Sequence, residues 1–555
     1  MIMKNKFVYM LICSLLFSTT ACDKEFLEIV PEDAPTVDGF YNSASEIRAV
    51  TATLYGRPWF EYNDKFSWAA GDGMAGDLFN DYQTEGQLFY LTYSDNNNII
   101  SQGWRGLYNV IAYANAIIND MPRVAGQNGV PQEVINAGLG EARFIRATAY
   151  YLLAEYWEEV PIIENVAALI ESNNIDVVKN TYSSVIEFVI RDLEFAAEHL
   201  PLVDEPGRVT TWAAQGMLAK VHLTRAQREK SAEDFAKAAA YAKNVIENSG
   251  LFLLEDYSDL FRIENNNNPE SLFALQWIGG AWGFGNSRQA VMGRSSLITG
   301  NSEAWGGYKG VTIDYMDNVE ENAEGGEDLR QPWIYMELGD FYPEIRKDAG
   351  GYTYNIVTPD PAGGGNLENP SPLLNNVKKY VVGSSADLGG IAINNQAVPL
   401  NQYMLRLADV YLIYAEAVLG MAESTSDPLA LAYFNAVRER AGLEPRTSIT
   451  YRDIFNERRV EFGMEGIAWL DVKRYFYHDP AAAIAYLNAQ DRAAIFEPIE
   501  GYEGDVNSWE AYEIVPPATP VVIDETDMVL PIPNGEIGQN PNLGPGVEAV
   551  EYIFE

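Results

Sequence analysis

The sequence is poor in the side chains that many enzyme sites use. It has only two cysteines, Cys13 and Cys22, among 555 residues, so a disulfide framework is not predicted. Its three histidines, His199, His222 and His478, lie far apart. Neither a His-Glu-x-x-His helix motif nor a Gly-x-Ser-x-Gly elbow occurs. The chain therefore carries no signature of a zinc protease or a serine hydrolase.

Basic residues and long apolar runs are also scarce. Lys and Arg number 38 against 79 Asp and Glu, which gives a formal net charge of −41. This charge repels nucleic acid and anionic lipid, so no nucleic-acid partner is predicted. Beyond the first residues, no segment reaches the run of about eighteen apolar residues that a transmembrane helix needs. The glycine-rich stretch 279–285 lacks the spacing of a phosphate-binding loop.

The excess of carboxylates leaves two alternatives open. Two acidic side chains that meet in the fold could act as a glycoside hydrolase pair, although no motif indicates one. The stretch from Asp314 to Asp328 could hold calcium, but it lacks the ordered ligand spacing of an EF-hand loop. We therefore predict no catalytic residue, no metal site and no cofactor, with calcium at this stretch as the alternative.

The N-terminus has the pattern of a lipoprotein signal. Lys4 and Lys6 precede an apolar stretch, and small residues lead up to Cys22. We predict that residues 1–21 are removed and that Cys22 carries acyl chains, such as palmitate, which anchor a soluble body to a membrane. The only thiol is then lipidated, which excludes a Cys-metal site or a Cys nucleophile. The alternative is an ordinary secretory signal with a chance cysteine.

Helical periodicity appears in two blocks. The first lies within residues 22–250 and the second within residues 402–555, and a loop-rich insertion at 251–401 separates them. Expected helices cover 101–121, 131–157, 181–200, 210–226, 232–248, 403–421, 427–441, 451–465 and 466–476. Pro122 is expected to end the first of these helices. Alanines on the inner faces favour close helix packing, so we predict a mainly α fold with tetratricopeptide-like helix hairpins and an irregular C-terminal tail.

Arginines and glutamates recur on the helices of the second block at spacings that permit ion pairs. They are Arg438, Arg440, Arg458, Arg459, Glu457, Glu461 and Glu465. We interpret them as a structural network that ties the block together, in preference to a ligand site. Arg143 and Arg146 in the first block receive the same interpretation.

Aromatic residues gather in two loop regions, 59–93 and 277–308. A sugar ring presents an apolar face that stacks on an aromatic side chain, while amides and charged groups bind its hydroxyls. The predicted ligand-binding residues are Trp282, Trp305, Trp68, Tyr82, Phe284, Tyr308, Asn80, Asp81, Asn286 and Arg288. Trp282 and Trp305 lead because neighbouring glycines leave each ring poorly supported. The alternative for any single ring is that it packs beneath a loop.

Several segments, in order, resemble the SusD/RagB family. They include Trp104 with Tyr108, Glu141-Ala142-Arg143-Phe144-Ile145-Arg146-Ala147, Arg406-Leu407-Ala408-Asp409-Val410-Tyr411-Leu412, Arg440-Ala441-Gly442-Leu443, Glu457-Arg458-Arg459, and the tail Leu530-Pro531-Ile532-Pro533. The resemblance covers nearly the whole chain after Cys22. It implies a lipid-anchored protein of the outer membrane that faces the cell exterior, and the charged residues after Cys22 are similar to the export signal of such lipoproteins.

The resemblance also implies a function and a partner. Members of this family capture nutrients and pass them to TonB-dependent transporters of the SusC type. We therefore expect a non-enzymatic protein that binds an oligosaccharide and delivers it to such a transporter. A peptide ligand is the alternative within the family, and a surface glycoside hydrolase is the alternative outside it.

Overall fold

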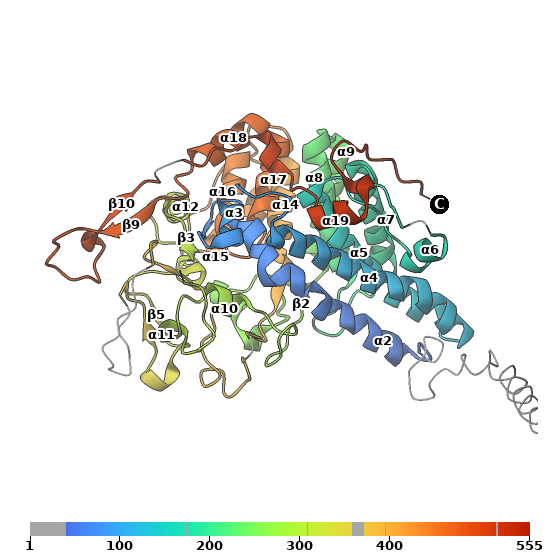
Figure 1. The fold of residues 1–555 in the computed structure, drawn as a ribbon, viewed down its shortest axis with the longest axis horizontal. Helices are drawn as coiled ribbons and strands as arrows, with labels where there is room; N and C mark the ends of the chain where they lie inside the picture. The colour runs from blue at the N-terminus through green and yellow to red at the C-terminus, as the bar shows by residue number, and fades with distance from the viewer. Residues whose placement is uncertain are drawn as a thin grey trace, which may run out of the picture.

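A computed structural model describes residues 40–173, 175–307, 309–357, 371–394, 396–517 and 520–554. The signal segment and the predicted lipidation site Cys22 lie outside these residues, as does Tyr308. Helices dominate the structure, and loop-rich chain lies beside the two helical blocks (Figure 1). The prediction of a mainly α fold with a helix-hairpin scaffold is confirmed. Among the described residues, no helix is both long enough and apolar enough to cross a membrane.

The first block is a row of antiparallel helices. Its elements are α2 (Ala44–Ala52), α3 (Gln83–Phe89), α4 (Asn98–Gln127), α5 (Gln132–Trp157), α6 (Val166–Glu171), α7 (Tyr182–His199), α8 (Thr211–Glu229) and α9 (Ala232–Asn248). Successive long helices contact one another, α4 with α5, α5 with α7, α7 with α8, and α8 with α9. The alanines Ala142, Ala149, Ala213 and Ala219 are fully buried, which lets the helices approach closely.

The expected end of the first long helix at Pro122 is wrong. Helix α4 continues through Pro122 to Gln127. A proline inside a helix removes one hydrogen bond and costs about 3 kcal/mol. Met121, Val124 and Ala125 are buried on both sides of Pro122, so packing of this face offsets the local cost.

The second block follows the same plan. Its helices are α14 (Leu407–Leu419), α15 (Pro428–Arg440), α16 (Tyr451–Glu461), α17 (Ala468–His478) and α18 (Pro480–Ala489). Helix α14 contacts both α9 and α15, which joins the two blocks. The expected helix 403–421 begins later than predicted, because residues up to Arg406 form strand β8 (Gln402–Arg406).

The insertion contains short strands and short helices. Its helices are α10 (Arg288–Met292), α11 (Ser296–Thr299), α12 (Ile313–Ala323) and α13 (Gln331–Ile334). Its strands are β2 (Ser271–Leu275), β3 (Gly310–Val311), β4 (Tyr335–Met336), β5 (Phe341–Tyr342), β6 (Tyr352–Thr353) and β7 (Asn376–Val377). Strand β2 pairs antiparallel with β8 at the start of the second block, with Ala274 opposite Tyr403. One hydrophobic core runs through both blocks and part of the insertion.

A buried ion-pair network holds the second block and includes five of the seven residues predicted for it. Its members are Arg330, Arg406, Arg438, Arg440, Glu270, Glu457, Glu461 and Glu465. The other two predicted residues pair elsewhere, Arg458 with Asp409 and Asp471, and Arg459 with Asp77 and Asp314. Glu461 contacts Arg330, Arg406 and Arg440 at once. In the first block, Arg146 makes a buried pair with Asp192 at 2.7 Å. A buried charge that lacks a partner costs several kcal/mol, so these pairs are part of the fold.

The C-terminal tail packs on the first block. It contains the hairpin of β9 (Ile495–Pro498) and β10 (Tyr512–Val515), which projects from the molecule in Figure 1, then α19 (Asn534–Gln539) and η12 (Pro541–Leu543). The Leu530 N–H donates to the Tyr156 carbonyl, and the Trp157 indole donates to the Pro531 carbonyl. Val550 bridges to Asn180, so the end of the chain closes against α7.

Candidate functional site

A short strand pair brings the two predicted aromatic regions together. Strand β1 (Leu78–Phe79) pairs with β3, with Leu78 opposite Val311. Beside this pair lies a cavity of about 690 Å³, within the range of small-molecule sites. Its lining residues are Asp64, Lys65, Asn80, Tyr82, Glu85, Trp282, Val291, Trp305, Gly306, Gly307, Lys309 and Gln396. Four of the predicted residues, Asn80, Tyr82, Trp282 and Trp305, therefore share one cavity.

Three of the lining rings are open to solvent. Tyr82, Trp282 and Trp305 are 56%, 51% and 59% exposed. Large aromatic side chains are usually mostly covered, so three half-exposed rings around one cavity form a platform for an apolar surface. The hydrogen bond from Ile278 N–H to the Phe284 carbonyl closes the loop that presents Trp282.

Arg57 supports the loop that carries Trp282. Its guanidinium lies 5.7 Å from the ring centre of Phe60 and 5.5 Å from that of Phe284. Phe60 in turn meets Trp282 edge-on at 4.9 Å. Gly283, at φ +82°, permits this arrangement, because a Cβ there would lie 2.6 Å from an Arg57 nitrogen. The tip of the loop is thus braced by cation–π contacts.

The polar floor of the cavity centres on Glu85, in the first turn of α3. Lys65 lies 2.7 Å and Lys309 lies 3.2 Å from its carboxylate, and the Asn80 amide donates to it at 3.0 Å. Burial alone would raise the pKa of Glu85, but Lys309, Lys65 and Asn80 outweigh burial and lower this pKa. The carboxylate therefore stays ionised and can accept hydrogen bonds from hydroxyl groups. The neighbouring Asp64 has a pKa that burial raises.

Three predicted contact residues are buried and support the site from within, which corrects the prediction. The Trp68 ring is fully covered, its indole donates to the Asp64 carbonyl, and the Lys309 ammonium lies 5.2 Å from its centre. Arg288 donates to the Met464 carbonyl and to the Ser67 hydroxyl, and Asn286 donates to the Leu400 carbonyl. All three side chains are at most 1% exposed and none lines the cavity, so a ligand in the cavity does not reach them.

The remaining predicted residues fall outside the lining. Phe284 and Asp81 are exposed but do not line the cavity. The stretch from Asp314 to Asp328, the alternative calcium site, does not form a binding loop, because most of it lies in α12. Asp314 pairs with Arg459, and Asp328 pairs with Arg330. Within the described ranges, no group of three or more His, Cys, Asp or Glu side chains could hold a metal ion.

The charged floor of the cavity was not predicted from the sequence. Lys65, Glu85 and Lys309 carry no motif, and their spacing gives no reason to single them out. The one indication in the sequence was the position of Lys309, which directly follows Tyr308 at the end of the second aromatic region. Pairing of β1 with β3 brings it to Glu85, and that pairing was not predicted.

Comparison of the sequence with known proteins identifies the family of this chain. The model described as "SusD family" matches residues 255–544, and the model described as "Starch-binding associating with outer membrane" matches residues 25–223. A SusD-like protein of Bacteroides ovatus is 35% identical, over 100% of this chain and 99% of that protein. The chain belongs to the SusD family. The resemblance inferred from the sequence is confirmed.

Solved structures of SusD-like proteins share the fold. A crystal structure described as containing xylogluco-oligosaccharide is 34% identical, with a TM-score of 0.80 over 92% of this chain and 99% of that one. A laminarin-binding SusD-like protein is 20% identical, with a TM-score of 0.65 over 89% of this chain and 97% of that one. The second likeness shows the SusD fold alone.

Proposed function

We propose that this SusD-family protein binds an oligosaccharide in the cavity lined by Tyr82, Trp282 and Trp305. The three half-exposed rings carry the proposal, since apolar sugar faces stack on such surfaces. Glu85, Lys65, Asn80 and Gln396 offer acceptors and donors for hydroxyl groups. The similar structure that holds a xylogluco-oligosaccharide supports a glycan ligand and suggests the first one to try.

We further propose the cellular role. Acyl chains on Cys22 would hold the protein at the outer membrane, on the exterior side, and the captured glycan would pass to a TonB-dependent transporter of the SusC type. Tethering the binding protein beside its transporter raises the effective concentration of ligand at the transporter's entrance, so moderate affinity suffices. No chemical step is assigned to the cavity, and its carboxylates act as hydrogen-bond acceptors.

Isothermal titration with xylogluco-oligosaccharides tests the site. Each exposed half of Trp282 or Trp305 corresponds to about 100 Å² of ring surface. Covering this area with a sugar face stabilises the complex by up to about 2.5 kcal/mol. Trp282→Ala and Trp305→Ala should therefore each weaken binding by about 10- to 60-fold.

Trp509→Ala is the matched control. Trp509 is 38% exposed, but it precedes β10 in the projecting hairpin and does not line the cavity. We expect this variant to bind like the wild type. Equal affinity of the wild type and both cavity variants would refute the site. Binding of peptides in place of glycans would favour the peptide alternative, and shortened glycan products would favour the hydrolase alternative.

A further inference from the structure

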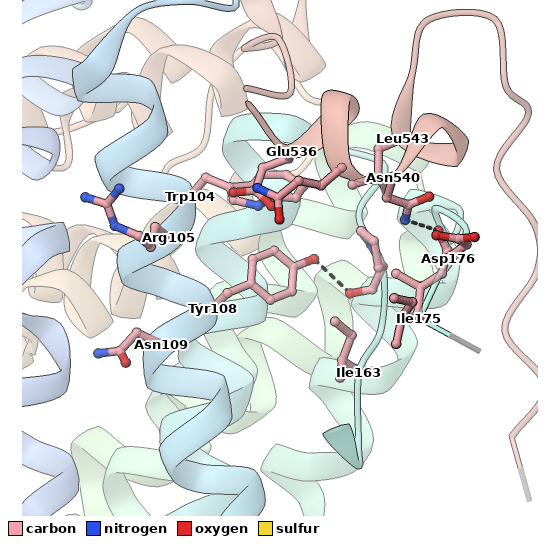
Figure 2. Close-up of a pocket in the computed structure, with 13 residues that line it drawn as sticks. Trp104, Arg105, Tyr108, Asn109, Ile163, Ile175, Asp176, Glu536, Asn540 and Leu543 are labelled. Carbon is pink, nitrogen blue, oxygen red and sulfur yellow. Dashed lines mark hydrogen bonds between the residues drawn. The ribbon is translucent and has the colours of Figure 1, made fainter. Parts of the chain in front are cut away.

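A second cavity, of about 750 Å³, lies on the first helical block away from the aromatic site. It opens between α4, residues 161–163 and 175–177, and the C-terminal elements α19 and η12 (Figure 2). The apolar part of its lining comes from Trp104, Tyr108, Ile163, Ile175 and Leu543. The volume falls within the range of cavities that bind ligands.

Hydrogen bonds fix the walls of this cavity in place. The Tyr108 hydroxyl donates to the Pro161 carbonyl at 2.9 Å. The Asn540 amide donates to the Val177 carbonyl at 2.7 Å, and the Asn542 amide donates to the Asp176 carbonyl at 2.9 Å. Three segments that are distant in sequence are thus locked around the space, so the cavity is a built feature of the fold.

Two carboxylates in the lining of the cavity are unpaired among the described residues. The side-chain carboxylates of Asp176 and Glu536 make no hydrogen bond and no ion pair with any residue in the described part of the chain. The amide donor of Asn540 is already used. Arg105 at the rim is the cation of the lining, and its Nε donates to Glu61 at 2.7 Å. Once that pair is counted, two negative charges remain.

Exposed apolar side chains also occur near Ile175 in the sequence. Ile175 is 62% exposed, Val166 and Ile170 before it are 46% and 64% exposed, and Val178 after it is 38% exposed. Every residue of the short helix α6 that carries two of them is at least partly exposed. Apolar side chains that gather on a surface are typical of places where another polypeptide binds.

We propose that this cavity binds an extended, basic polypeptide segment. A Lys or Arg side chain of the segment pairs with the carboxylates of Glu536 and Asp176, and an adjacent apolar side chain covers Tyr108 and Ile175. The charge balance favours a cationic polypeptide over an uncharged sugar, because unpaired carboxylates are attracted to a positive charge. This inference does not depend on the glycan cavity.

Fluorescence anisotropy with labelled pentapeptides tests the proposal on the full chain. The probes are Leu-Lys-Leu-Lys-Leu, Leu-Glu-Leu-Glu-Leu and Ser-Lys-Ser-Lys-Ser. Only the first should bind well, because it combines the cation with the apolar side chain. Changing both carboxylates, Glu536→Gln with Asp176→Asn, should weaken binding about tenfold, as expected for two partly exposed ion pairs. These side chains have no partners in the described structure, so the variant should fold normally.

A charge-matched control separates the cavity from the overall negative field. Glu510→Gln with Glu513→Gln removes two charges from the projecting β9–β10 hairpin, outside the cavity. We expect this variant to bind the peptide like the wild type. Equal weakening in both double variants would show that only the field attracts the peptide. No binding of the basic peptide, or its displacement by a xylogluco-oligosaccharide, would also overturn the proposal.

Discussion

Replacing Arg406 by Met tests whether the buried ion-pair network stabilises the second helical block. Arg406 is 1% exposed and contacts Glu270 at 2.9 Å, Glu465 at 2.9 Å and also Glu461. Its guanidinium additionally donates to the Glu461 carbonyl at 2.7 Å. Met keeps much of the side-chain volume, so the substitution removes chiefly the charge and the hydrogen bonds.

The expected cost follows from what each carboxylate retains. Removing one partner of a buried ion pair typically costs about 3–5 kcal/mol. Here Glu270 keeps Arg440 at 2.7 Å, and Glu465 keeps Lys379 at 3.2 Å. Glu461 keeps Arg330 at 2.9 Å. Because no carboxylate is left without a cation, we expect the lower end of the range, about 3 kcal/mol.

Equilibrium unfolding in urea, followed by circular dichroism, measures the effect. With a slope of about 3 kcal/mol per M, a loss of about 3 kcal/mol lowers the midpoint by about 1 M. Lys237→Met is the control, since Lys237 pairs with Glu233 on the exposed face of α9. We expect no measurable shift for this control. A midpoint for Arg406→Met equal to that of the wild type would refute the structural role of the network.

Three further perturbations have defined outcomes. Burial raises the pKa of Asp72 from 3.8 to about 7, so the native state retains a proton that the unfolded state loses, and stability falls as the pH rises from about 4 to about 7. Asp72→Asn should therefore remove about 3 kcal/mol of the difference in unfolding free energy between pH 5 and pH 8, and identical pH profiles of the two proteins would contradict the assignment. Gly71→Ala should prevent stable folding, because its Cβ would lie 2.2 Å from the Gly466 carbonyl oxygen. Gly126→Ala, in open space at the end of α4, should raise the urea midpoint of unfolding slightly. Similar midpoints for the two variants would contradict the close approach of Gly71 to Gly466. Arg57→Gln should weaken glycan binding about fivefold, because the loop that carries Trp282 loses its cation–π contacts to Arg57 through Phe60 and Phe284. An unchanged Kd in the titration would contradict this supporting role.

Helices were predictable wherever local periodicity and packing agree. The expected helix 232–248 coincides with α9, and Thr181 caps α7 by accepting a hydrogen bond from the Ser184 N–H. The errors lie where distant contacts decide. Residues 403–406 carry a helical pattern, but β2 pairs with them from about 130 positions upstream. The boundaries of the three predicted regions stay predictions, since one core crosses them.

The exposed rings of the candidate site could be predicted from the sequence, but the charged residues Lys65, Glu85 and Lys309 could not. Glycines beside Trp282 and Trp305 leave those rings without local support, which is visible in sequence. Trp68 has a similar aromatic neighbourhood, yet its ring is fully buried, and Lys309, the residue before β3, lies over it where β3 pairs with β1. Sequence spacing contains no record of that pairing, so neither the burial of Trp68 nor the Lys65–Glu85–Lys309 cluster could be anticipated.

The docking of the C-terminal tail onto the first helical block has a consequence for biosynthesis. Helices α5 and α7 emerge early from the ribosome, but Leu530, Pro531 and Val550, which hydrogen-bond to them or to the residues beside them, are made last. The first block therefore cannot reach its final form until synthesis is almost complete. A truncated product would lack these closing contacts and would expose the covered helix surface to proteolysis.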